Sequence, residues 1–250
     1  MENLWKENGK QDKGRKCDML EAIGIKASYK GNGWKQKRKE VLKNINFKAE
    51  SGQCIGLIGA NGAGKSTLLS ILSGIRKPDN GQLIFEGKDL FLKENRKLIK
   101  EISGYVPQEN PLIEELTVFD NLMLWYFDKK RLQKEIREGK LVDFGLEEYL
   151  KVPVNKLSGG LKKRVSIACA VADNPKIMIM DEPTAALDML CKHDIMNYIH
   201  KCKNSGKIII FSTHDETELQ ICDRLYVLRS GELGEVPTGL SSKELVNLQK

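Results

Sequence analysis

A short glycine-rich motif limits what this chain can fold into more than any other feature of its sequence. Residues 56–72 read GLIGANGAGKSTLLSIL and contain the pattern G-x-x-x-x-G-K-S from Gly59 to Ser66. An apolar stretch typical of a buried strand, residues 53–59, precedes the pattern, and a helical pattern follows it from Lys65. The motif therefore predicts a strand, a tight loop and a helix in immediate succession.

The same motif predicts a loop that binds the phosphates of a nucleotide. Its glycines permit backbone conformations in which successive N–H groups point at phosphate oxygens, and the following helix N-terminus adds partial positive charge. Lys65 would place an ammonium beside the β- and γ-phosphates, and the Ser66 hydroxyl would bind Mg²⁺. The predicted nucleotide-binding residues of this loop are Gly59, Ala60, Asn61, Gly62, Ala63, Gly64, Lys65, Ser66 and Thr67.

Two carboxylates later in the chain can complete a site for hydrolysis. Asp181 ends the apolar run IMIMD (177–181), where it is expected to bind Mg²⁺ directly or through water. Glu182 comes next, and because side chains alternate along a strand, we expect it to point away from Asp181. Glu182 could then act as the general base on the attacking water.

The order of the expected elements indicates an α/β fold. Apolar strand-like stretches alternate with helical segments, which is typical of a mostly parallel sheet covered on both faces. These stretches are residues 53–59, 82–87, 102–107, 177–181, 207–213 and 224–231. Residues 20–29 and 41–50 show the alternation of half-buried strands and predict an antiparallel β subdomain on the N-terminal side.

Residues 110–176 have helical spacing and no strand pattern. Two of the helical stretches in it are LTVFDNLMLWYF (116–127) and LQKEIREGKLVDFGL (132–146). We therefore expect an α-helical subdomain inserted into a P-loop NTPase core. The predicted organisation is a flexible N-terminal tail at 1–18, the nucleotide-hydrolysing domain at 19–240, and a C-terminal helix or tail at 241–250.

The composition is that of a globular protein. Of the 250 residues, 40% are hydrophobic and 30% charged, and no run approaches the roughly 18 apolar residues of a membrane-spanning helix. The N-terminal residues lack the apolar stretch of a secretory signal, so a cytosolic chain is expected. The six cysteines are scattered without a C-x-x-C pair, which favours free buried thiols over a zinc site or disulfides.

The net charge of +7 raises the question of a nucleic-acid partner. Most basic residues are mixed with Asp and Glu along the chain, so no nucleic-acid partner is expected. The exception is KGNGWKQKRKE, residues 30–40. This segment is either a solvated hairpin loop or a contact for phosphate headgroups or a nucleotide.

A second candidate phosphate site lies in LSGG, residues 157–160, directly before a helical pattern. Ser158 at a helix start could be an ordinary N-cap. Alternatively, a phosphate could bind the bare backbone amides at this helix N-terminus.

The phosphate loop, LSGG and IMIMDEP, in this order, resemble the nucleotide-binding domain of the ABC ATPase superfamily over about residues 20–235. GANGAGKS resembles the Walker A motif and IMIMD the Walker B motif, with Glu182 in the position of the catalytic base. Gln108, in YVPQ, is similar to the Q-loop glutamine that senses Mg²⁺ and couples to the transport partner. AALD (185–188) resembles the D-loop, and His214, in FSTHD, the switch histidine that contacts the γ-phosphate.

This resemblance implies that the nucleotide is ATP, bound with Mg²⁺, and that an aromatic residue stacks on its adenine. Tyr29 fits that position, before the strand at 41–50. The eleven-residue basic loop after Tyr29 is longer than is common in the family, so Trp34 is an alternative.

The resemblance also gives LSGG a function, because LSGG is the signature motif of the family. It implies that Ser158, Gly159 and Gly160 bind the γ-phosphate of an ATP held by a second subunit, either another copy or a paralogous ATPase subunit. The chain would then dimerise head-to-tail around two ATP. Leu161 departs from the pattern, since the family usually has Gln there.

Three functions within the family remain open. The chain could be the ATPase subunit of a transporter with a separate integral membrane permease, an ATPase acting on ribosomes or DNA, or a regulator of a membrane complex. One phosphate loop and short helices before LSGG argue against the second. LTVFDNL resembles ATPases of ABC-2-type exporters, which favours an exporter subunit, cytoplasmic and peripheral on the membrane. The permease would dock against apolar residues near Leu112 or Val118.

Overall fold

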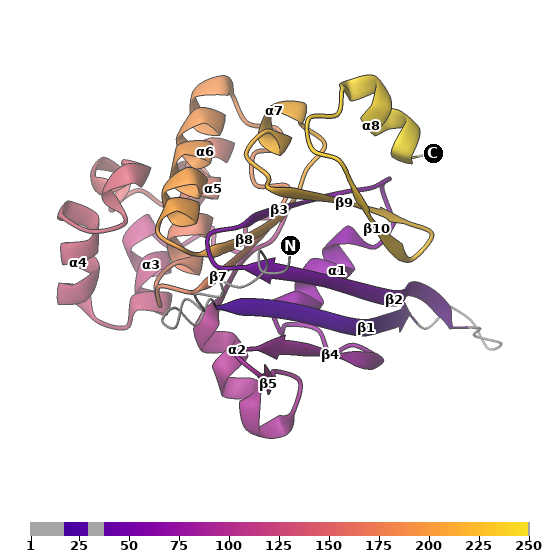
Figure 1. Ribbon diagram of the computed structural model, residues 1–250. Helices are drawn as coiled ribbons and strands as arrows, with labels where there is room; N and C mark the ends of the chain where they lie inside the picture. The colour runs from indigo at the N-terminus through magenta and orange to yellow at the C-terminus, as the bar shows by residue number, and fades with distance from the viewer. Residues whose placement is uncertain (1–17, 30–37, 250) are drawn as a thin grey trace, which may run out of the picture.

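The computed structural model describes residues 18–29 and 38–249 and contains two sheets with helices around them (Figure 1). The basic segment 30–37, including Trp34, and most of the expected N-terminal tail lie outside the described residues. The α/β fold class, with its antiparallel sheet on the N-terminal side, is confirmed.

The larger sheet is parallel except at one edge. Its strands, in spatial order, are β10 (Glu232–Val236), β9 (Arg224–Arg229), β3 (Cys54–Ile58), β8 (Ile208–Ser212), β7 (Ile177–Asp181) and β6 (Ser103–Val106). Only β10 runs antiparallel to its neighbour. The central strands β3, β7 and β8 are buried at every residue, which explains why they are apolar throughout.

The smaller sheet is antiparallel. Its spatial order is β2 (Lys39–Glu50), β1 (Met19–Tyr29), β4 (Asn80–Phe85) and β5 (Lys88–Asp89). Buried and exposed residues alternate along most of β2, as expected for a sheet with one face against the core. The two sheets meet near the β9–β10 turn, where the Lys43 N–H donates to the Gly231 carbonyl at 2.8 Å.

Helices cover both faces of the parallel sheet (Figure 1). On one side, α1 (Lys65–Leu72) lies between the two sheets, and α2 (Arg96–Ile102) leads into β6. On the other side, the segment between β6 and β7 forms the helical subdomain, coloured magenta to salmon at the left of Figure 1. Its helices are α3 (Val118–Tyr126), α4 (Lys129–Arg137) and α5 (Gly159–Ala170), joined by the short turns η2 (Val142–Phe144), η3 (Glu147–Tyr149) and η4 (Val154–Lys156).

The remaining helices follow the strands of the C-terminal half. They are α6 (Met189–Asn204), α7 (Glu216–Leu219) and α8 (Ser242–Gln249), and a single turn, η1 (Lys93–Asn95), precedes α2. In the part of the chain that the structure describes, no helix is long and apolar enough to cross a membrane.

Alternate residues of the central strands supply two separate cores. In β7, Met178 and Met180 pack with the helical subdomain and α6, whereas Ile177 and Ile179 pack with α1 and the antiparallel sheet. The same alternation divides β3 and β8 between these clusters. This burial on both faces holds β7 beside α1, the helix that follows the phosphate loop.

The structure differs from the sequence expectations in three places. The apolar stretch 82–87, grouped with the parallel strands, belongs to β4 of the antiparallel sheet. The helical stretch expected over 132–146 ends at Arg137, and Gly139 and Gly145 follow in a turn and at the end of η2. The strand β10 was not expected. A tight turn at Ser230 and Gly231, with φ of 51° and 79°, reverses the chain and pairs β10 with β9.

Candidate functional site

The phosphate loop joins β3 to α1, and two of its glycines have no room for a side chain. Gly59 has φ of 156°, and a Cβ there would lie 2.5 Å from the Leu228 carbonyl oxygen. Gly64 has φ of 111°, and a Cβ there would lie 2.7 Å from a methyl group of Val41. Close packing against β9 and β2 therefore requires glycine at both positions.

Lys65, the first residue of α1, is 6% exposed and turns back over the loop. Its Nζ donates to the Gly59 carbonyl at 2.7 Å and lies 3.1 Å from Nε2 of His214. Burial lowers the pKa of Lys65, while the carboxylates of Glu182 and Asp181 oppose this shift. Carbonyl groups of the loop itself thus hold the ammonium over the loop.

The two predicted carboxylates lie at the end of β7 in different environments. Asp181 is 3% exposed and accepts a hydrogen bond from the Ser212 hydroxyl on β8. Glu182 is not in the strand: it has φ of 47°, and its N–H donates to the Ser212 carbonyl at 3.1 Å. The argument from side-chain alternation along a strand is therefore wrong for Glu182. This residue follows the strand, and its left-handed backbone conformation sets the direction of its side chain.

Glu182 joins the two other predicted catalytic residues. The Gln108 side-chain amide donates to Oε2 of Glu182 at 3.0 Å, and Nε2 of His214 lies 3.4 Å from Oε1. Burial and the Lys65 charge lower the pKa of His214, and Glu182 partly opposes them. A neutral imidazole can accept a hydrogen bond from Lys65 through Nε2, with the proton on Nδ1.

A cleft of about 570 Å³ unites these residues. It is lined by Tyr29, Val41, Asn61, Gly62, Gly64, Lys65, Ser66, Thr67, Gln108, Glu182 and His214. Asp181 is buried and does not line the cleft, and Gly59, Ala60 and Ala63 belong to the loop without lining the cleft. The cleft thus brings an ammonium, hydroxyls and a carboxylate together.

Tyr29 stands at the edge of the cleft and is 47% exposed. Its hydroxyl lies 2.9 Å from that of Thr67, and the Arg76 guanidinium sits over its ring at 3.8 Å from the centroid. Arg76 also donates to the Ser28 carbonyl at 2.9 Å. Sequence reasoning did not find Arg76, because no motif connects it to a tyrosine 47 residues earlier.

The predicted residues of LSGG do not line this cleft. Ser158 is the N-cap of α5, and its hydroxyl accepts a hydrogen bond from the Leu161 N–H at 3.3 Å. A Cβ on Gly159 would meet nothing within 4 Å, whereas one on Gly160 would collide with the Cys191 sulfur. Within one chain the motif caps α5 and lies outside the cleft of its own phosphate loop.

Lys163, one turn into α5, is a residue that sequence reasoning missed. It is 3% exposed, and its ammonium donates to the carbonyls of Pro107 at 3.1 Å and Gln108 at 2.9 Å. Burial lowers the pKa of Lys163 to about 8, although Asp181 and Glu182 raise it. The helix that begins at LSGG is thereby tied to the segment that carries Gln108.

The predicted Mg²⁺ ligands offer the oxygen donors that this ion prefers: the hydroxyl of Ser66, the carboxylate of Asp181 and the side-chain oxygen of Gln108. Ser66 and Gln108 line the cleft, and Asp181 lies at the adjoining strand end. Among the described residues, no cluster of three His, Cys, Asp or Glu side chains could hold a metal alone. The residues fit an ion that is completed by phosphate oxygens and water.

Comparison with known protein families identifies the chain. The ABC transporter domain matches residues 42–185, more than half of the sequence. The chain belongs to the ABC transporter family. Within this ABC transporter domain lie the phosphate loop, Gln108, the LSGG motif and the two carboxylates.

Curated relatives of this ABC transporter chain are ATP-binding subunits. The linearmycin resistance ATP-binding protein LnrL of Bacillus subtilis is 33% identical over 88% of the chain and 69% of its own length. The lipopolysaccharide export system ATP-binding protein LptB of Escherichia coli is 33% identical over 86% of the chain and 88% of its own length. The putative hemin import ATP-binding protein HrtA of Staphylococcus epidermidis is 36% identical over 84% of the chain and 97% of its own length.

Some relatives are much longer, and the chain spans only 37% of one from Clostridium perfringens. Among solved structures, the ATP-binding cassette MJ0796, a dimer in a post-hydrolysis state with ADP and Pi, superposes with a TM-score of 0.79 at 29% identity. The match covers 89% of this chain and 99% of that one. ATP binding and hydrolysis are thus properties of the family to which this chain belongs.

Two of the hollows outside the cleft lie beside or within the helical subdomain. One, about 430 Å³, opens between the two subdomains and is lined by Ile75, Tyr105, Pro107, Leu112 and Trp125 among others. Leu112 thus lies where the sequence placed an apolar groove. Val118 does not: it is fully buried in the core, so its assignment to the groove is wrong.

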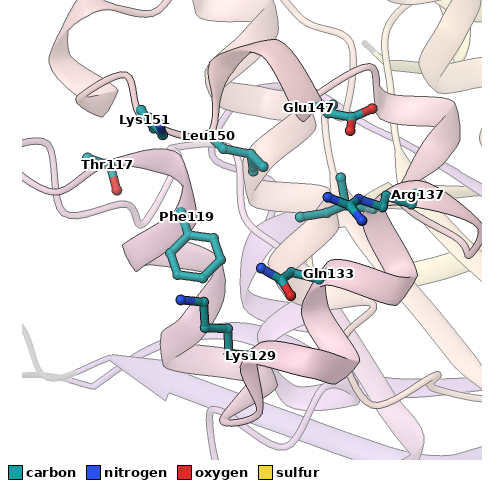
Figure 2. Close-up of a pocket in the computed structure, with 9 residues that line it drawn as sticks. Thr117, Phe119, Lys129, Gln133, Arg137, Glu147, Leu150 and Lys151 are labelled. Carbon is teal, nitrogen blue, oxygen red and sulfur yellow. The ribbon is translucent and has the colours of Figure 1, made fainter.

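The other hollow, about 350 Å³, lies within the helical subdomain, between α3, α4 and the turn η3 (Figure 2). Phe119 and Leu150 form apolar wall, and the charged side chains of Lys129, Arg137 and Glu147 surround them. No residue of the predicted ATP site lines it.

Proposed function

We propose that the chain is the ATPase subunit of an ABC exporter that dimerises around two Mg²⁺–ATP and drives a separate membrane permease. The observation that carries this proposal is the cleft that unites the phosphate loop with Gln108, Glu182 and His214 but excludes LSGG. A phosphate loop whose cleft lacks LSGG, and an LSGG helix N-terminus outside that cleft, fit a site that two chains share. The dimeric state of MJ0796 supports this arrangement.

In the proposed mechanism, the loop amides and Lys65 bind the β- and γ-phosphates, and Tyr29 stacks on the adenine. Arg76 lies over one face of the Tyr29 ring, and the base would stack on the other. Ser66, Asp181 and Gln108 would hold Mg²⁺, which supplies positive charge that offsets the charge developing on the phosphate oxygens.

Glu182 would take the proton of the attacking water, because its carboxylate lies beside both Gln108 and His214 at the open side of the loop. His214, kept neutral by burial and by Lys65, would accept or donate one hydrogen bond at the γ-phosphate. Ser158 and the amides of Gly159 and Gly160 of the second subunit would close the site.

Glu182→Gln tests the role of the general base. We expect unchanged ATP affinity and a turnover lower by about 10²- to 10⁴-fold, the usual range for such a group. Titration with a fluorescent ATP analogue and a steady-state phosphate assay measure the two quantities. Normal turnover in Glu182→Gln would leave Glu182 a structural residue.

The groove lined by Leu112 and Trp125 is the proposed docking site of the permease. Leu112→Glu should abolish copurification of a membrane permease from the native cells and leave ATP binding intact. Leu124→Glu is the matched control, because Leu124 is 49% exposed on the same helix as Trp125 but does not line the groove. Recovery with ribosomes instead of a membrane protein would contradict the proposal.

Export, as opposed to import, is supported by the resemblance of LTVFDNL to ABC-2-type exporters and by the name of LptB. The name of HrtA points in the other direction. An exporter predicts that cells lacking the gene retain a compound that wild-type cells release. Comparison of cell and medium metabolites in the two strains tests the direction.

A further inference from the structure

A basic pocket adjoins the proposed docking groove. It has a volume of about 530 Å³ and lies between the end of α1, the segment after β5, and α2. Its lining residues are Ser73, Gly74, Ile75, Arg76, Lys77, Leu90, Phe91, Arg96, Ile99 and Lys100. Ser73, Ile75 and Lys100 line the docking groove as well, so the two hollows share a wall.

The charges of this basic pocket are all positive. Its lining contains four cationic side chains and no carboxylate. Arg76 already has partners, since it stacks on Tyr29 and donates to the Ser28 carbonyl. The side chains of Lys77, Arg96 and Lys100 form no ion pair or hydrogen bond with the residues that the structure describes.

Apolar residues of the basic pocket complement these charges. Leu90 and Ile99 are buried in its wall, whereas Ile75, on the wall shared with the groove, is 68% exposed. The hollow of the helical subdomain differs, because there Glu147 lies among the cations (Figure 2). The basic pocket thus lacks internal charge balance and exposes a large apolar residue at its border with the groove.

We propose that the basic pocket receives carboxylate side chains of the permease segment that docks in the adjoining groove. That segment would place apolar residues against Ile75 and Leu112 and acidic residues over Lys77, Arg96 and Lys100. The inference rests on the proposed function, which supplies the permease. The inference adds the composition of the permease segment, which would be apolar and acidic and not basic or neutral.

The groove and the basic pocket together would select a segment by two properties, its apolar surface and its acidic residues. Apolar contacts in the groove give attachment that depends little on sequence, whereas unpaired cations reject segments that lack acidic residues. ATPase subunits of other transporters with a similar groove but different charges beside it would then bind this permease weakly.

The test uses two fluorescein-labelled amphipathic peptides with the same leucine stripe. One carries a cluster of glutamates at one end, and the other carries glutamines in their place. Anisotropy titrations with the full-length protein at low salt should show about tenfold tighter binding of the acidic peptide, the scale expected for a few exposed ion pairs. High salt should remove this preference.

Lys77→Glu/Arg96→Glu should abolish the preference for the acidic peptide. Neither residue lines the groove or the ATP cleft, so ATP binding should be unchanged. The matched control is Lys129→Glu/Arg137→Glu, which makes the same change of charge around the helical-subdomain hollow (Figure 2) and should keep the preference.

Equal binding of the two peptides, or equal losses in the two double variants, would overturn the proposal. So would loss of binding to phosphatidylglycerol-containing vesicles in Lys77→Glu/Arg96→Glu without any change for the peptides, which would indicate a membrane surface instead. Failure of the proposed function would give a distinct result. In that case Leu112→Glu would still copurify with the permease, independently of the result of the peptide titrations.

Discussion

At the scale of single residues, the unusual groups around the ATP cleft are polar side chains that packing has removed from water. Glu218 on α7 is 3% exposed, and its Oε2 has no hydrogen-bond partner among the described residues. It lines a hollow that also contains Glu182 and His214. Burial, assisted by the charges of Asp215 and Glu182 and opposed by Thr213 and Lys192, raises the pKa of Glu218 to about 7.

This raised pKa predicts a pH dependence of stability. The folded chain binds a proton that the unfolded chain releases near pH 4.5, so stability falls as pH rises from about 4.5 to about 7. Glu218→Gln mimics the protonated acid and should remove this fall. Relative to wild type, the variant should gain up to about 3 kcal/mol in unfolding free energy between pH 5 and pH 8.

Urea unfolding at the two pH values measures the effect. Glu216→Gln is the control, because Glu216 lies on the same short helix but is exposed. If the unfolding free energies of wild type and Glu218→Gln differed by the same amount at both pH values, the burial argument would be contradicted.

At this scale the sequence was most informative where a residue's role follows from near neighbours in the chain. Lys65 and Ser66 were assigned from the loop that contains them, and the structure places both in the cleft. Arg76 and Lys163 were missed, because their contacts with Tyr29 and Gln108 bring together residues 47 and 55 positions apart. Such contacts depend on how elements pack, which no local pattern encodes.

At the scale of elements, α5 links two parts of the proposed machinery. It begins at the LSGG cap, and one turn later Lys163 holds the carbonyls of Pro107 and Gln108. Gln108 in turn contacts Glu182. A displacement of the signature helix by a second subunit would therefore move the segment that positions Gln108.

Lys163→Met tests this link, because methionine is similar in length but cannot donate hydrogen bonds. Two charge-assisted hydrogen bonds to backbone would be lost, each worth roughly 1.5–3 kcal/mol. We expect kcat to fall about tenfold or more with little change in ATP affinity, and the amides of residues 107–110 to exchange hydrogen faster. Steady-state kinetics and hydrogen exchange give the two readouts.

Lys162→Met is the matched control, since Lys162 is on the same helix but pairs with Glu114 at the surface. The link would be disproved if Lys163→Met and Lys162→Met had the same rates of ATP hydrolysis and of amide hydrogen exchange at residues 107–110.

The same contrast holds for helices and strands: those set by adjacent residues were predicted, and those set by contacts with other elements were missed. The strand, loop and helix around Lys65 were predicted, because the motif, the apolar run and the helical spacing agree. The strand β10 was missed, because its residues are mostly exposed and have no apolar pattern. It exists because the Ser230–Gly231 turn brings it beside β9. Val118 was misplaced because a helical apolar pattern does not tell which residues face the core.

At the scale of the whole molecule, the arrangement of the sites determines how many chains are needed. Within one chain LSGG does not line the ATP cleft, so in the proposed dimer a second chain brings its signature to the cleft. In a head-to-tail dimer each site combines the phosphate loop of one chain with the signature of the other. Leu161 leaves the serine and glycine groups of that signature intact, so we expect a working site.

This arrangement predicts that two inactive variants restore activity when mixed. Lys65→Ala removes the phosphate contact of the loop, and Gly159→Asp places a carboxylate against the γ-phosphate. Gly159 is suited to this change, because a side chain there meets no atom within 4 Å, whereas Gly160 packs against Cys191. An acidic residue in the first turn is also compatible with the dipole of α5.

In a mixed dimer, one site carries both substitutions and the other carries neither. Random association of equal amounts makes half of the dimers mixed, so about a quarter of wild-type activity should return if the two sites act independently. Each variant alone should remain inactive at the same total concentration, and a phosphate assay on the three samples decides the matter. If the mixture is no more active than its components, each chain hydrolyses ATP within its own cleft, and LSGG is only the cap of α5.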